Sequence, residues 1–330
     1  MFILFHRMLN TILPPFTFAP FLLGLMCYAY AVPSLSQTQD NGFNLSNTSI
    51  PREQIMHGGP PRDGIPALTN PAFIHAAKAR FLDSNARVIG VYLGGESKAY
   101  PISILNYHEI VNDQIAGKRI VVTFCPLCGT GIVYDAKVGD KTLNFGVSGL
   151  LYNSDVLLYD RQSESLWSQI ISSAISGPMQ GQKLTRIPAL HTTWQEWLKQ
   201  FPQTLVLSQS TGYQRNYQTT PYQGYNESND IFFPVSNRDF RYHSKEVVIA
   251  IEVNGLTKAY PFVELARYQK AQQLSVLRDS IAGAEIVVEF NLAARSGRII
   301  DAKGKELPSF QAFWFAWMAF HPNSEVFTYQ

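Results

Sequence analysis

Charged residues are scarce in this chain of 330 residues, at 16% against the roughly 25% of an ordinary soluble protein. The formal net charge is only +2, and no run of lysine and arginine is longer than two residues. The basic surface that binds DNA or RNA is therefore missing, and no nucleic-acid partner is expected. The sequence also lacks a glycine-rich phosphate loop, so no nucleotide cofactor is expected.

Cysteine is scarce as well, with three residues in the chain. Cys27 lies in an N-terminal stretch, residues 8–39, that contains no charged residue and follows Arg7. The small residues of Ala29-Tyr30-Ala31 complete the pattern of a cleavable secretory signal over residues 1–31. Its removal leaves only Cys125 and Cys128, which excludes a framework of scattered disulfides.

An uncleaved membrane anchor is the alternative interpretation of the same stretch. Pro14 and Pro15 interrupt a helix, and residues 16–31 rise about 24 Å, which is less than the roughly 30 Å of a hydrocarbon core. We therefore expect an exported protein, periplasmic or extracellular, with no transmembrane span in its mature chain. Residues 32–62, rich in Ser, Asn, Gln, Pro and Gly, are predicted to form a flexible linker.

The rest of the chain contains a duplication. Residues 88–105 and 248–265 are identical at eight of eighteen positions and share Lys-Ala-Tyr-Pro, and residues 115–124 and 281–290 are identical at seven of ten. We predict an α+β fold of two tandem, degenerate β-β-α-β-β repeats packed as pseudo-equivalent halves. The first repeat, 63–247, carries the candidate site and a β-meander inserted at about 144–183, and the second, 248–330, is structural.

Differences between the copies identify residues that the fold does not require. Cys125-Pro126-Leu127-Cys128 stands opposite Asn291-Leu292-Ala293-Ala294, and His108 and Glu109 stand opposite Tyr268 and Gln269. Cys125 directly follows a predicted buried strand, 120–124, and His108 lies on the predicted inward face of the preceding helix. A helix packed on that strand would bring His108 near the thiols.

Two thiols and an imidazole suggest a metal site. Cys125, Cys128 and His108 are predicted to bind one copper or zinc ion, with Glu109 orienting His108. The Cys-x-x-Cys spacing is also typical of thiol–disulfide exchange, although the residues after Cys128 predict a turn and a strand instead of the helix of thioredoxin. Catalytic roles for Cys125, Cys128, His108 and Glu109 follow from either interpretation, and whether the protein is an enzyme stays open.

A third interpretation is a non-catalytic module that binds a cell-envelope protein through a surface rich in Tyr and Trp. Cys125 and Cys128 would then form a plain structural disulfide. Arg161, in the predicted meander, is a further candidate for a site residue because its guanidinium suits a small anionic ligand.

Several of these motifs together resemble the DUF3179 family, whose function is undefined. The resemblance covers roughly residues 63–265, and it rests on Cys125-Pro-Leu-Cys-Gly-Thr, Gly146-Val-Ser-Gly, Leu151-Tyr-Asn-Ser, Tyr159-Asp-Arg and Ser165-Leu-Trp-Ser-Gln. It implies an exported bacterial or archaeal protein built around the Cys-x-x-Cys motif. It implies no established catalytic role for any residue.

Overall fold

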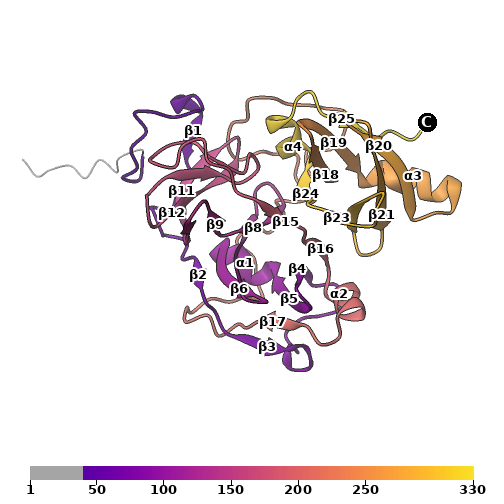
Figure 1. Cartoon of the computed structure of the whole chain (residues 1–330), viewed down its shortest axis with the longest axis horizontal. Helices are drawn as coiled ribbons and strands as arrows, with labels where there is room; N and C mark the ends of the chain where they lie inside the picture. The colour runs from indigo at the N-terminus through magenta and orange to yellow at the C-terminus, as the bar shows by residue number, and fades with distance from the viewer. Residues whose placement is uncertain (1–39) are drawn as a thin grey trace, which may run out of the picture. The chain divides into compact units, whose positions relative to one another are not determined.

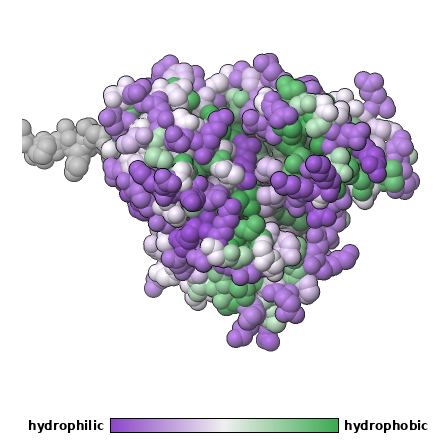
Figure 2. Space-filling view, viewed as in Figure 1, coloured by the Kyte–Doolittle hydropathy of each residue, from purple (hydrophilic) through white to green (hydrophobic). Residues whose placement is uncertain are grey.

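A computed structural model of the chain describes residues 40–330, and the signal predicted over residues 1–31 lies outside them. The described chain is mostly β (Figure 1), with 40% strand and 13% helix, and its larger sheets form a five-bladed β-propeller arrangement. Among the described residues, no helix is long and apolar enough to cross a membrane. The view in Figure 2 shows hydrophilic residues over much of one face, with hydrophobic residues in smaller groups between them.

Three sheets come from the first two thirds of the chain. The first has the order β16 (Leu190–Thr193), β4 (Arg87–Leu93), β5 (Glu96–Pro101), β17 (Leu205–Leu207) and β3 (Phe73–His75). The second has the order β15 (Arg186–Ile187), β8 (Thr130–Asp135), β7 (Lys118–Cys125), β6 (Ile110–Ile115) and β2 (Leu68–Thr69). The third has the order β1 (Ile55–His57), β11 (Phe145–Tyr152), β12 (Asp155–Asp160), β13 (Leu166–Ser168) and β14 (Ser173–Ala174).

The last third of the chain forms two four-stranded sheets. One has the order β24 (Phe310–Phe313), β18 (Val247–Val253), β19 (Leu256–Pro261) and β25 (Glu325–Val326), and the other β20 (Val276–Ile281), β21 (Ala284–Asn291), β22 (Ser296–Asp301) and β23 (Glu306–Leu307). The short strands β9 (Lys137–Val138) and β10 (Lys141–Thr142) pair separately. The α-helices are α1 (Ile102–His108), α2 (Trp194–Gln200), α3 (Phe262–Gln272) and α4 (Trp314–Phe320), and the 3-10 helices are η1 (Arg52–Gln54) and η2 (Ala76–Lys78).

The predicted α+β fold of two pseudo-equivalent halves is wrong. The helices are short, with seven to eleven residues for α1 to α4, so they cover little of the sheets. The meander insertion also forms a sheet of its own, which has no counterpart in the second copy. Local sequence patterns predict most of the strands. Which strands pair in the same sheet depends on contacts between distant segments, which such patterns do not contain.

The linker prediction fails for residues 40–62. Phe43 and Leu45 are buried in a hydrophobic cluster, and β1 pairs antiparallel with β11 from Ile55–Tyr152 to His57–Leu150. The few apolar residues of this polar segment therefore pack against the inserted sheet, and β1 extends that sheet next to β11. With only three paired residues, β1 is too short to give a recognisable strand pattern in a segment of polar composition.

The duplicated Lys-Ala-Tyr-Pro segment has a structural role in both copies. Lys98 Nζ and Tyr100 OH lie 2.8 and 2.7 Å from Oδ2 of Asp113 on β6, so the ion pair joins two sheets. Lys258 and Tyr260 contact Asp279 Oδ2 in the same way, at 2.9 and 3.0 Å. The repeated motif therefore marks a polar contact between two sheets that both copies share, buried in the first and partly buried in the second.

This contact predicts unequal costs for two matched substitutions. Asp113→Ala leaves the buried Lys98 ammonium without a counter-ion and should lower the free energy of unfolding by about 3–5 kcal/mol. Asp279→Ala should cost less, because Lys258 keeps a second carboxylate, Glu325, at 3.4 Å. Chemical denaturation of both variants measures the difference. Equal losses, or a larger loss for Asp279→Ala, would contradict this explanation.

Candidate metal centre

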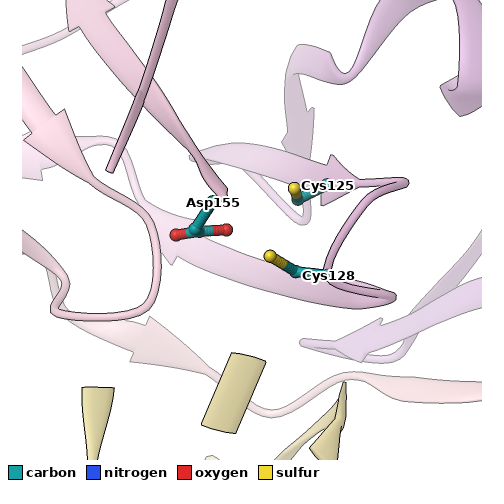
Figure 3. Close-up of side chains that lie close together, drawn as sticks. All are labelled: Cys125, Cys128 and Asp155. Carbon is teal, nitrogen blue, oxygen red and sulfur yellow. The ribbon is translucent and has the colours of Figure 1, made fainter. Parts of the chain in front are cut away.

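Cys125, Cys128 and Asp155 form the one group of possible metal ligands found in the described part of the chain. One ligand atom from each residue lies within 4.8 Å of the other two, and all three residues are buried. Cys125 ends β7, Cys128 lies in the turn to β8, and Asp155 begins β12. Figure 3 shows both sulfur atoms directed toward the Asp155 carboxylate.

The turn that carries the thiols is held from two sides. The Cys128 N–H donates to the Cys125 carbonyl at 3.2 Å, and the Cys128 carbonyl accepts the N–H of Phe313 in β24 at 2.8 Å. Gly129 adopts φ +61°, and a Cβ there would lie 2.9 Å from the Phe313 ring. Both the backbone conformation and the close ring therefore require glycine after the second cysteine.

Asp155 has an unpaired oxygen. Its Oδ2 accepts the Ile170 N–H at 3.1 Å, and its buried Oδ1 has no hydrogen-bond partner within residues 40–330, although the nearby Cys125 and Cys128 thiols act to lower the Asp155 pKa. The buried hydroxyls of Ser154 and Tyr225 likewise have no hydrogen-bond partner in the described part of the chain. Buried polar atoms without partners cost about 1–3 kcal/mol each, so such a group fits a ligand or ion better than an ordinary core.

Burial favours the protonated forms of the acidic groups of this centre. Desolvation raises the pKa of Asp155 to about 7. It raises the pKa values of the Cys125 and Cys128 thiols too, and each thiol feels the Asp155 charge. Both cysteines are free thiols, at 3.8 and 3.3 Å from the Ser154 carbonyl oxygen. A bound cation would compensate the charge that the apolar surroundings penalise.

His108 is not brought to this group. Its Nδ1 lies 2.7 Å from the Pro66 carbonyl oxygen and its Nε2 lies 2.6 Å from the Tyr217 hydroxyl, so both ring nitrogens have partners elsewhere. Burial lowers the pKa of His108. His108 is therefore a buried histidine paired within the fold, and the residue that lies beside the two cysteines is Asp155.

Glu109 lies on the side of the cysteines and does not orient His108. Desolvation and the Asp155 charge raise its pKa to about 8, while a hydrogen bond to Tyr222 opposes this rise. Its backbone adopts φ +55°, which costs a residue with a side chain on the order of 1–3 kcal/mol. This conformation ends α1 one residue after His108, so the two side chains reach different surroundings.

Arg161 does not belong to the centre. It lies beyond the far end of β12, six residues from Asp155, which is roughly 20 Å along a strand. Its guanidinium forms two hydrogen bonds with the Asp63 carboxylate, at 2.7 and 2.9 Å. The positive charge is thus already paired with an acid.

Asp155 is not among the site residues that the sequence predicts. It follows Asn153 and Ser154 in a polar segment between two meander strands, where aspartate is common. A signal was present, because Asp155 also opens the apolar run Val156-Leu-Leu-Tyr159, and a carboxylate at the start of a buried strand needs a partner.

The fold and this cluster define a mostly β domain with a buried Cys₂Asp group. The chain belongs to the DUF3179 family of proteins of unknown function, whose family model matches residues 62–324. No curated protein and no solved structure gives a significant match.

The raised pKa of Glu109 predicts how stability changes with pH. The folded, metal-free protein holds this proton more tightly than the unfolded chain, so the stabilisation is present below about pH 4 and is lost as the pH rises through about 8. Between pH 5 and 8 the wild type should lose on the order of 3 kcal/mol relative to Glu109→Gln. Denaturation midpoints of the wild type and of Glu109→Gln, measured between pH 5 and 8, test this prediction. Parallel pH profiles would show that Glu109 titrates normally.

Proposed function

We propose that the protein binds one copper or zinc ion through Cys125, Cys128 and Asp155. The observation that carries the proposal is the unpaired, buried Asp155 Oδ1 beside two free thiols. Thiolate sulfur favours soft or borderline ions, and a carboxylate oxygen is an accepted third ligand for zinc. Membership of the DUF3179 family, whose function is unknown, is neither evidence for metal binding nor evidence against it.

Charge balance supports a divalent or monovalent cation at this point. Two thiolates and a carboxylate carry three negative charges, which this apolar interior tolerates only with compensation. Three protein ligands leave one position of a tetrahedral ion for water or a small ligand. Glu109, with its pKa of about 8, is available to hold or release a proton nearby.

We include export of the mature chain in the proposal. The uncharged stretch 8–39 and its small-residue cleavage pattern support a signal over residues 1–31. Cleavage would remove Cys27 and leave the two cysteines of the centre as the only thiols. In this proposal residues 63–247 carry the site, and residues 248–330 provide supporting sheets.

Substitutions of the three proposed ligands test the assignment. Asp155→Asn removes the carboxylate charge with little change in shape, so the affinity for Zn²⁺ should fall at least tenfold, while Cys125→Ser and Cys128→Ser should abolish stoichiometric binding. Elemental analysis and calorimetric titration with Zn²⁺ and Cu⁺ measure this.

Asp160→Asn is the matched control, because Asp160 is buried at the other end of β12 and pairs with Trp167 and Ser163. It should keep about one equivalent of metal. His108→Gln should keep it too, since both ring nitrogens of His108 have partners elsewhere. Metal loss in His108→Gln with retention in Asp155→Asn would refute the ligand set.

Metal affinity should also increase with pH. The thiols must lose protons to bind the ion, and burial raises the pKa of both, so protons compete strongly at low pH. Titrations at pH 6, 7 and 8 should show affinity increasing at each step, with protons released in proportion. An affinity that is constant over this range would contradict ligation by these thiols.

Thiol–disulfide exchange is the second candidate, favoured by the closeness of the two sulfur atoms to each other and to a buried acid. Burial of both thiols and their raised pKa values count against it, because reactive thiols are accessible and have lowered pKa values. Native protein carrying Cys27→Ser should therefore react slowly with a thiol reagent and rapidly once denatured. Fast labelling of a native thiol would favour the redox function over the metal site.

A further inference from the structure

A cavity of about 530 Å³ adjoins the cysteine turn. Pro126 and Gly129 of the turn form part of its wall, together with residues from β16 and β24 and from the turn between β21 and β22. Its size is in the range of small-molecule sites. The lining residues include three cations, Arg87, Lys245 and Arg295, and no aspartate or glutamate.

None of the three cations forms an ion pair with an acid among residues 40–330. Arg87 donates to the carbonyls of His191 and Arg295 at 3.2 and 3.1 Å, and desolvation lowers its pKa to about 10. Lys245 Nζ donates to two carbonyl oxygens, at 3.1 and 2.5 Å, and the nearby Asp230 charge opposes the lowering of its pKa by burial. Cations that line one cavity without an ion-pair partner attract an anion.

Arg295 is the most informative of the three. It occupies the position that Gly129 has in the first copy, and both adopt a left-handed conformation, with φ values of +43° and +61°. Glycine accepts this conformation without strain and arginine does not, so the fold gains nothing from an arginine here. No hydrogen bond of the Arg295 side chain is found within the described residues.

His191 also lines the cavity. Desolvation lowers its pKa well below the usual value, and its buried Nδ1 has no hydrogen-bond partner within residues 40–330. The ring is therefore neutral and can donate or accept one hydrogen bond. Glu246 lies near Arg295 but outside the cavity lining, and its Oε1 accepts the Val263 N–H at 2.8 Å; burial raises the pKa of Glu246, and the Arg295 charge opposes this rise.

We propose that this cavity binds a small organic carboxylate. Arg295 and Lys245 would hold the carboxylate group, and Ile102, Phe124 and Phe313 would contact its apolar body. These apolar residues favour an organic acid over an inorganic anion, because an inorganic anion has no apolar part to contact them. The proposal assigns the anion site to this cavity in place of Arg161, whose charge Asp63 compensates. It does not depend on the metal site.

Calorimetric titration of the full protein tests this with phenylacetate, its neutral counterpart phenylacetamide, and inorganic phosphate. Phenylacetate should bind at least tenfold more tightly than either. Arg295→Gly, which restores the residue of the first copy, should weaken phenylacetate binding at least tenfold without loss of thermal stability. Arg278→Gly, a control at an exposed position of β20, should bind as the wild type does.

Equal binding of the acid and the amide, or unchanged affinity in Arg295→Gly, would overturn the proposal. Binding of phosphate without phenylacetate would overturn the assignment of an organic acid. Binding of phenylacetate should persist in Asp155→Asn, so a failure of the metal proposal is distinguishable from a failure of this one.

Discussion

Desolvation of two thiols and a carboxylate at one point is the constraint on which the centre depends. Cys125 and Cys128 belong to the largest hydrophobic cluster, together with Trp167, Trp314 and Trp317, and Asp155 lies against them. Such groups persist in an apolar interior only when they are protonated or bound to a cation. The surrounding elements meet at this point: β7 and β8 form the turn, β12 supplies the carboxylate, and β24 holds the turn through the Phe313 N–H.

Two buried carboxylates of the first copy show how structural and candidate functional groups differ. Asp113 is paired with a cation and a hydroxyl, and the second copy repeats the arrangement at Asp279. Asp155 has an orphan oxygen and lies in the inserted sheet, which the second copy lacks. The duplication was visible in the sequence, as were most strands, because their alternation is local. The assembly into five sheets was not, because pairs such as β1–β11 join segments almost a hundred residues apart.

The centre itself could be predicted only in part. The absence of Cys125 and Cys128 from the second copy located it, because a residue that the fold does not need is free to serve another purpose. Helical spacing placed His108 on an inward face, which is correct, but burial does not say which neighbour a side chain meets, and His108 meets Pro66 and Tyr217. Asp155 was hidden by its polar neighbours. Arg295 could not be identified from the sequence, because charged residues are common in turns. Only the structure shows that its backbone is left-handed.

X-ray absorption spectroscopy of the metal-loaded protein tests the central claim most directly, since it reports the atoms bound to the ion. For the zinc-loaded protein, ligation by Cys125, Cys128 and Asp155 predicts two sulfur neighbours at about 2.3 Å and one or two oxygen neighbours at about 2.0–2.2 Å. The Asp155→Asn variant should change the oxygen shell and keep both sulfurs. A first shell of nitrogen and oxygen without sulfur, or one with the scattering pattern of imidazole, would contradict the account.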